Sequence, residues 1–195
     1  LSVGAGLQET SKGTLEYIAD TCNRAIEAGA SRLMLADSLG SLSPFGMKFL
    51  VEQINQRLCQ PVPIIVHCHN SFGQATMNAC AAVTGGAAGM HVAANGLGLH
   101  GGLSSLEETA VALEMLFGLS TGIATDKLYE FCKYVEDATG VILPRHRPAV
   151  GDYNFVYETE ADVLEVLAGG HVGELEKLSY PVARTFAPEA VGLHR

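Results

Sequence analysis

Several features that mark particular protein classes are missing from this sequence. It has no block of Lys and Arg residues and a formal net charge of -9, so we expect no nucleic-acid partner and no acidic membrane surface. No apolar run approaches the roughly 18 residues that span a bilayer, and no secretory signal is visible. The five cysteines form no CxxC pair and are odd in number, which favours reduced thiols in a cytoplasmic protein.

The composition is that of a folded α/β protein. Of the 195 residues, 48% are hydrophobic and 17% are charged, which suffices for one sizeable core and excludes a disordered chain. Strand-like and helix-like patterns alternate four times, in units about 30 residues long, as βα units do. The near-continuously apolar strands indicate a parallel sheet covered on both faces. The expected strands are 1–6, 32–36, 62–68 and 89–94, and the expected helices are 14–28, 43–58, 71–84 and 104–118.

The pattern changes towards the carboxyl terminus. There the sequence predicts a helix at 125–140, an extended linker at 144–148, a helix at 158–168 and an irregular tail from 169. We therefore expect two parts, residues 1–120 and a mostly helical appendage, 121–195.

Polar and glycine-rich segments follow three of the expected strands, at 37–40, 67–70 and 95–102. In parallel α/β folds the active site lies at those strand ends. Side chains alternate along a strand, so His67 and His69 should face the same way and Cys68 the other way. Two such imidazoles can hold one divalent ion. The alternative is two unrelated histidines, one structural and one solvated.

Four motifs stand out along the expected βα units: DSLG at 37–40, HCHNSFG at 67–73, HVAANGLG at 91–98 and LEE at 106–108. Together they resemble one enzyme family, the metal-dependent TIM-barrel lyases and synthases. This family includes isopropylmalate, citramalate and homocitrate synthases and hydroxymethylglutaryl-CoA lyase. Residues 147–151 and 188–192 look like the subdomain that follows the barrel in the synthases.

The resemblance implies a (β/α)8 TIM-barrel fold, of which residues 1–120 look like the second half, the fifth to eighth βα units. The family's first strand carries a D-R-E-like motif, and no such segment is present in this sequence. We therefore expect a fragment or split subunit that needs the missing barrel half or a second subunit, and we expect a homo-oligomer.

The resemblance also implies a chemistry. Such enzymes make or break carbon–carbon bonds, in Claisen- or aldol-type reactions of a 2-oxo acid and an acyl-CoA or their adduct, with one divalent ion (Mn, Mg or Zn). His67 and His69 match the metal ligands. Asp37 and Ser38 match a pair near the 2-oxo acid carboxylate, and Asn95 lies in the matching substrate loop. For Asp37, a loop or helix cap is the structural alternative.

The loop after the last strand departs from the family pattern. Leu99, His100 and Leu103 stand where the family has Glu, Arg and Asn. His100 could serve as a base near neutral pH, or it could be a solvated loop histidine. His91, on a strand, is expected in the core or behind the ligands. These departures leave open a second reading, a degenerate or regulatory paralogue that keeps the fold without turnover.

Overall fold

The computed structural model describes residues 2–156 and 186–193, so the helix expected at 158–168 lies outside the described residues. Contacts divide the chain into two compact units, Leu1–Leu113 and Glu114–Arg195. Each unit is described by itself below. None of the helices that the structure describes is long and apolar enough to cross a membrane.

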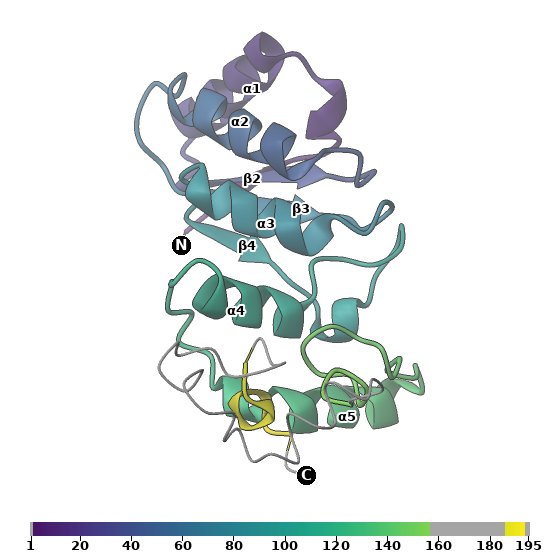
Figure 1. The fold of residues 1–195 in the computed structure, drawn as a ribbon. Coiled ribbons are helices and arrows are strands. Elements are labelled where there is room, and N and C mark those ends of the chain that lie inside the picture. Colours follow the sequence, from purple (N-terminus) through teal and green to yellow (C-terminus); the bar gives the residue numbers. More distant parts are fainter. Residues whose placement is uncertain (1, 157–185, 194–195) are drawn as a thin grey trace. The chain divides into compact units, whose positions relative to one another are not determined.

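Unit 1 is built on a four-stranded parallel sheet with the order β1-β2-β3-β4 (Figure 1). A helix follows each strand, which confirms the predicted alternation. The strands are β1 (Gly4–Leu7), β2 (Arg32–Asp37), β3 (Ile64–Cys68) and β4 (Gly89–His91), and the helices are α1 (Leu15–Glu27), α2 (Pro44–Asn55), α3 (Ala75–Thr84) and α4 (Leu106–Met115).

Side-chain oxygens mark the starts of three of these helices. The Thr14 hydroxyl accepts a hydrogen bond from the Tyr17 N–H, and the Ser43 hydroxyl accepts one from the Gly46 N–H. At the start of α4, the Ser105 hydroxyl accepts one from the Glu108 N–H. Each bond satisfies an amide that the first helical turn leaves without a partner. The polar residues before the apolar stripes therefore set where the helices begin.

The core of unit 1 lies between the sheet and its helices. One buried cluster joins α1 and α2 to β2 and β3, and a second joins α2 and α3 to β3. Both clusters use the same face of the sheet, through residues such as Leu33, Leu35 and Val66. The opposite face carries Gly6, Met34, Ile65 and His91, which line a concavity of about 290 Å³. Cover on both faces was expected, whereas the described helices pack on one.

Several elements are shorter than predicted, and the hydrogen bonds around two of them show why. Strand β4 ends at His91 because the chain beyond it pairs with the segment before α4: the Ala93 N–H donates to the Ser104 carbonyl, and the Ser104 N–H donates to the Cys68 carbonyl. Helix α3 begins only at Ala75, since residues 71–73 form a turn closed by the Gly73 N–H and the Asn70 carbonyl. Loops thus close over the carboxyl ends of β3 and β4.

Unit 2 contains helix α5 (Leu128–Thr139), preceded by a 3₁₀ turn at Thr125–Lys127, and a second 3₁₀ turn at Pro188–Val191. The extended linker expected at 144–148 is wrong. The Arg147 N–H donates to the Pro144 carbonyl, which makes a turn, and the nearby Val150 is fully buried. Val191 is also fully buried, so the described part of the expected tail packs into unit 2.

Candidate metal centre

The end of β3 brings two histidines together. The Nε2 atoms of His67 and His69 lie 3.3 Å apart, which confirms that the two side chains share a face. Cys68 points the other way, as predicted, into the cluster between the sheet and α3. Burial there, with a smaller contribution from the charge of Asp37, raises the pKa of the Cys68 thiol to about 12. Cys68 is therefore a core residue.

The separation of the two nitrogens fits a shared metal ion. At a metal–nitrogen distance of about 2.0–2.1 Å, two ligands of a tetrahedral ion stand about 3.3–3.4 Å apart. The observed 3.3 Å between the Nε2 atoms matches that spacing. Imidazole nitrogen is also a ligand that suits zinc, iron, copper and nickel. The two side chains thus fit one divalent ion.

A backbone carbonyl fixes the orientation of His69. The His69 Nδ1 atom lies 3.0 Å from the Leu99 carbonyl oxygen. A carbonyl can only accept, so His69 carries its proton on Nδ1, and its Nε2 lone pair is left for a metal. The Leu99 side chain is exposed, so what this residue contributes to the site is its backbone oxygen. That support survives the replacement of the family's Glu by leucine.

His67 has a different neighbour. It lies opposite His91 in the register of β3 and β4, and the Nδ1 atoms of the two rings are 3.2 Å apart. Burial, followed by the charges of His69 and His91, lowers the pKa of His67 below its ordinary value. A depressed pKa keeps the imidazole neutral, as a metal ligand must be.

His100 is the fourth histidine of this group. Its ring centroid lies 5.4 Å from that of His69, with the ring planes at 85°. The residue is exposed and has a φ of 54°, which its position in the glycine-rich loop imposes. Its carbonyl accepts from the Asn70 N–H, so the loop is tied to the end of β3. The structure therefore brings His67, His69, His91 and His100 together at one strand end.

The described residues supply only part of a ligand set. Among them, no group of three or more His, Cys, Asp or Glu side chains is arranged to hold a metal ion. Two histidines are fewer protein ligands than the three that catalytic zinc sites use.

The Asp37 side chain is hydrogen-bonded within the loop that follows β2. It is fully buried, and its carboxylate accepts hydrogen bonds from the Ser41 N–H at 3.1 Å and the Leu42 N–H at 2.9 Å. It faces the helices with Cys68, its partner in the register of β2 and β3. This geometry supports the loop-cap alternative, and we leave Asp37 out of the proposed site.

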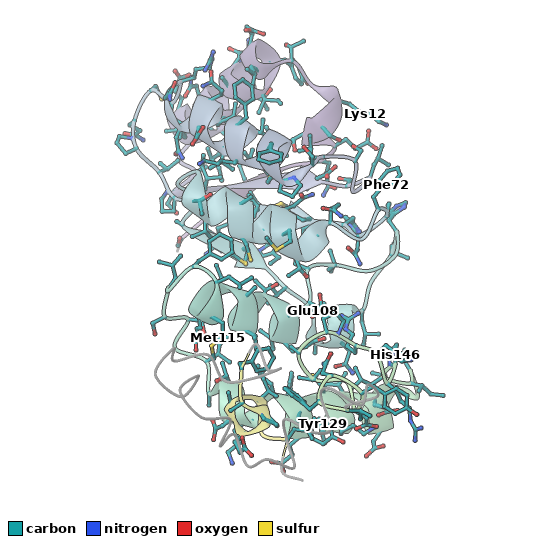
Figure 2. All side chains as sticks on the ribbon, viewed as in Figure 1. Lys12, Phe72, Glu108, Met115, Tyr129 and His146 are labelled. Carbon is teal, nitrogen blue, oxygen red and sulfur yellow. The ribbon has the colours of Figure 1, made fainter. Side chains whose placement is uncertain are left out.

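Ser38 and Asn95 lie at the same end of the sheet. The Ser38 hydroxyl accepts from the Glu9 N–H and donates to the Gln8 side chain, both at 3.0 Å. Asn95 has a left-handed backbone with φ 54°, and its N–H donates to the Glu107 carboxylate. Figure 2 shows Lys12 and Phe72, from the loops after β1 and β3, at this same end of unit 1.

Sequence reasoning gave no role to Gly40 and Glu107 and placed His91 only loosely. A Cβ atom on Gly40, whose φ is 61°, would lie 2.5 Å from the His69 carbonyl oxygen, so the loop after β2 can pass this close only as glycine. Glu107 is fully buried and holds the Asn95 loop. The signal for both was their place inside the DSLG and LEE motifs.

The chain combines parallel βα units of the TIM-barrel type with two paired histidines at the carboxyl end of a strand, and sequence comparison specifies its family. The HMGL-like family model matches residues 2–135, and the chain belongs to this family. The (R)-citramalate synthase CimA of Methanocaldococcus jannaschii is 34% identical over 195 residues, covering 100% of this chain and 37% of that protein. The 2-isopropylmalate synthase of Sulfolobus acidocaldarius is 35% identical over 190 residues, covering 96% and 46%.

A comparison of folds agrees with this family. The crystal structure of HMG-CoA lyase from Bacillus subtilis matches with a TM-score of 0.63 and 24% identity, covering 74% of this chain and 52% of that one. This match confirms the TIM-barrel type of the parallel sheet and its alternating helices. The chain spans 37% and 46% of the lengths of the two synthases. It therefore corresponds to part of such a domain.

Proposed function

We propose that this chain is part of a divalent-metal-dependent enzyme that makes or breaks a carbon–carbon bond between a 2-oxo acid and an acyl-CoA, or in their adduct. The observation that carries the proposal is the 3.3 Å pairing of the His67 and His69 Nε2 atoms at the carboxyl end of β3. The names of the relatives, (R)-citramalate synthase and 2-isopropylmalate synthase, support the reaction class.

In this proposal each described residue has a limited task. His67 and His69 hold the ion, which when bound would polarise a substrate oxygen and stabilise developing negative charge. The Leu99 carbonyl holds the His69 ring, so that its Nε2 lone pair stays aimed at the site. His100, exposed beside His69, is the group proposed to move a proton at its ring nitrogen. Ser38 and Asn95 are proposed to border the substrate.

The proposed substrates are an acyl-CoA and a 2-oxo acid, and the proposed location of the protein is the cytoplasm. The remaining metal ligands are proposed to come from the segments that complete the barrel or from a second subunit. The outer edges of β1 and β4 pair with no other strand of the described residues, so they are where such a partner would add its strands.

The second candidate is a paralogue that keeps the fold without turnover. It is favoured by the lack of a third donor beside the two histidines in the residues that the structure covers. Its prediction differs in one respect: metal would bind, but no carbon–carbon chemistry would follow.

The test begins with metal content. The chain, with the segments that complete the barrel supplied, is stripped and then loaded with Mn²⁺, Zn²⁺ or Mg²⁺. It should hold one ion, and His67→Ala/His69→Ala should hold none. His146→Ala, which removes an exposed histidine in unit 2, is the control and should keep the ion. Full metal content in the double variant would rule the site out.

The second stage measures turnover. The chain, with the segments that complete the barrel supplied, is given acetyl-CoA and a panel of 2-oxo acids, and loss of the thioester absorbance is followed. A rate of roughly 1–10³ s⁻¹ that depends on His67 and His69 supports the enzyme. Stoichiometric metal without turnover on any member of the panel supports the paralogue.

A further inference from the structure

His91 stands beside the paired histidines without being one of them. In the register of β3 and β4 it faces His67, with Nδ1 atoms 3.2 Å apart and ring planes at 84°. A contact of that length between ring nitrogens is a hydrogen bond, in which one nitrogen donates and the other accepts. The position of one proton on His67 therefore decides the position of one proton on His91.

Without a metal, one arrangement satisfies every contact. The His69 Nδ1–H donates to the Leu99 carbonyl, which leaves the His69 Nε2 atom as an acceptor. His67 then donates from Nε2 to His69, at 3.3 Å, and its own Nδ1 accepts from the His91 Nδ1–H. The four groups form a chain of hydrogen bonds that all run in one direction.

A metal ion requires the opposite arrangement on His67. Both Nε2 atoms must offer lone pairs, so the His67 proton must sit on Nδ1. Among the described residues, the side chain within hydrogen-bond distance of that Nδ1 is His91. His91 can accept there only if its own proton sits on Nε2. His91 is exposed among the described residues, so water can accept a hydrogen bond from that Nε2–H.

We propose that His91 is a positioning residue that switches tautomer when a divalent ion binds to His67 and His69. This inference deepens the proposed function and rests on it. On binding, the proton of His91 Nδ1 passes to His67 Nδ1, His91 Nε2 takes a proton from water, and His67 Nε2 gives one to water. Protons balance, all three rings stay neutral, and His91 coordinates nothing.

The experiment uses the full chain with ¹⁵N-labelled histidine and a titration with Zn²⁺. Long-range ¹H–¹⁵N spectra distinguish protonated, bare and metal-bound ring nitrogens. We expect His91 to carry its proton on Nδ1 before zinc and on Nε2 after it, with His67 and His69 bound through Nε2. An unchanged His91 tautomer, or a metal-bound shift on His91 itself, overturns the inference.

Affinity measurements on variants provide the second readout. His91→Leu removes the acceptor and should weaken zinc binding 10–100-fold, the usual effect of losing a group behind a ligand. His91→Asn retains an accepting oxygen and should stay within a few-fold of wild type. The control is His146→Leu, the same change at an exposed residue of unit 2. Equal affinity of His91→Leu and wild type refutes the positioning role.

The two proposals fail in different ways. If the wild-type chain binds no zinc even with the segments that complete the barrel supplied, the metal site itself is refuted, and the role of His91 is refuted with it. If the wild-type chain binds zinc through His67 and His69 while His91 stays unmoved, only the inference about His91 is refuted.

Discussion

Replacing Asp37 separates a structural role from a role in substrate binding. Its buried carboxylate accepts from the backbone N–H groups of Ser41 and Leu42, at 3.1 and 2.9 Å. Hydrogen bonds to a charged group contribute about 1.5–3 kcal/mol each. These two share one acceptor group and are not additive, so Asp37→Ala should lower the free energy of unfolding by about 2–4 kcal/mol.

Two further variants calibrate the effect. Asp37→Asn keeps one accepting oxygen and should cost about half as much. Asp20→Ala, which removes an exposed carboxylate paired with Arg24 at 2.9 Å, should cost less than about 1 kcal/mol.

Urea unfolding followed by far-ultraviolet circular dichroism measures all of these variants, with the slope of the transition checked against wild type. Because Asp37 faces the helices, zinc affinity per folded molecule should not change. A stability of Asp37→Ala within about 0.5 kcal/mol of wild type would refute the capping argument, since surface changes alone give differences of that size.

Four other expectations follow from the same geometry. Cys59 is exposed and should react first with a maleimide, while Cys68, buried and with its pKa raised to about 12, should stay unmodified in mass spectra of the native chain; early modification of Cys68 would contradict its placement. Gly40→Ala should destabilise the chain by more than about 1 kcal/mol and weaken zinc binding, because the new Cβ would lie 2.5 Å from the His69 carbonyl oxygen. An unchanged melting temperature and an unchanged zinc affinity would contradict this prediction. Burial lowers the pKa of His67, so at acid pH the folded state binds fewer protons than the unfolded state. The contribution of His67 to the free energy of unfolding is therefore fully present above about pH 6.5 and is lost as pH falls through the folded pKa. Melting curves should show a smaller acid sensitivity for His67→Ala than for wild type. Finally, the open outer edges of β1 and β4 should make the chain dimerise or aggregate, and a monodisperse monomer in sedimentation would argue against this.

Local chemistry made the fold of unit 1 predictable. Thr14 and Ser43 cap the helices that begin after them, and the β2 and β3 strands coincide with apolar runs bounded by turns. What the sequence could not give was the path of the loops. The turn after Asn70 and the pairing of Ala93 with Ser104 depend on partners distant in the chain, and periodicity carries no information about such partners.

The site was predictable to the same degree. Alternation along a strand placed His67 and His69 on one face, because that property belongs to the strand alone. The contact of His67 with His91 needs the register between β3 and β4, which only the folded sheet defines. Asp37 shows the opposite limit: the family resemblance predicts it near the substrate, yet its position in β2 turns its side chain towards the helices.

The replaced loop residues weigh less against function than the sequence suggested. The family pattern has Glu and Asn at positions 99 and 103, and leucine can supply neither a ligand nor an orienting hydrogen bond there. In the structure, however, the support for His69 comes from the backbone carbonyl of Leu99, and the support for His67 comes from His91. A carbonyl is present whatever side chain position 99 carries, and β4 supplies His91. The hydrogen bonds that orient both proposed ligands are therefore independent of the two departures. Under the proposed function, turnover then depends on further metal ligands and on His100, and these are what the zinc and thioester measurements address.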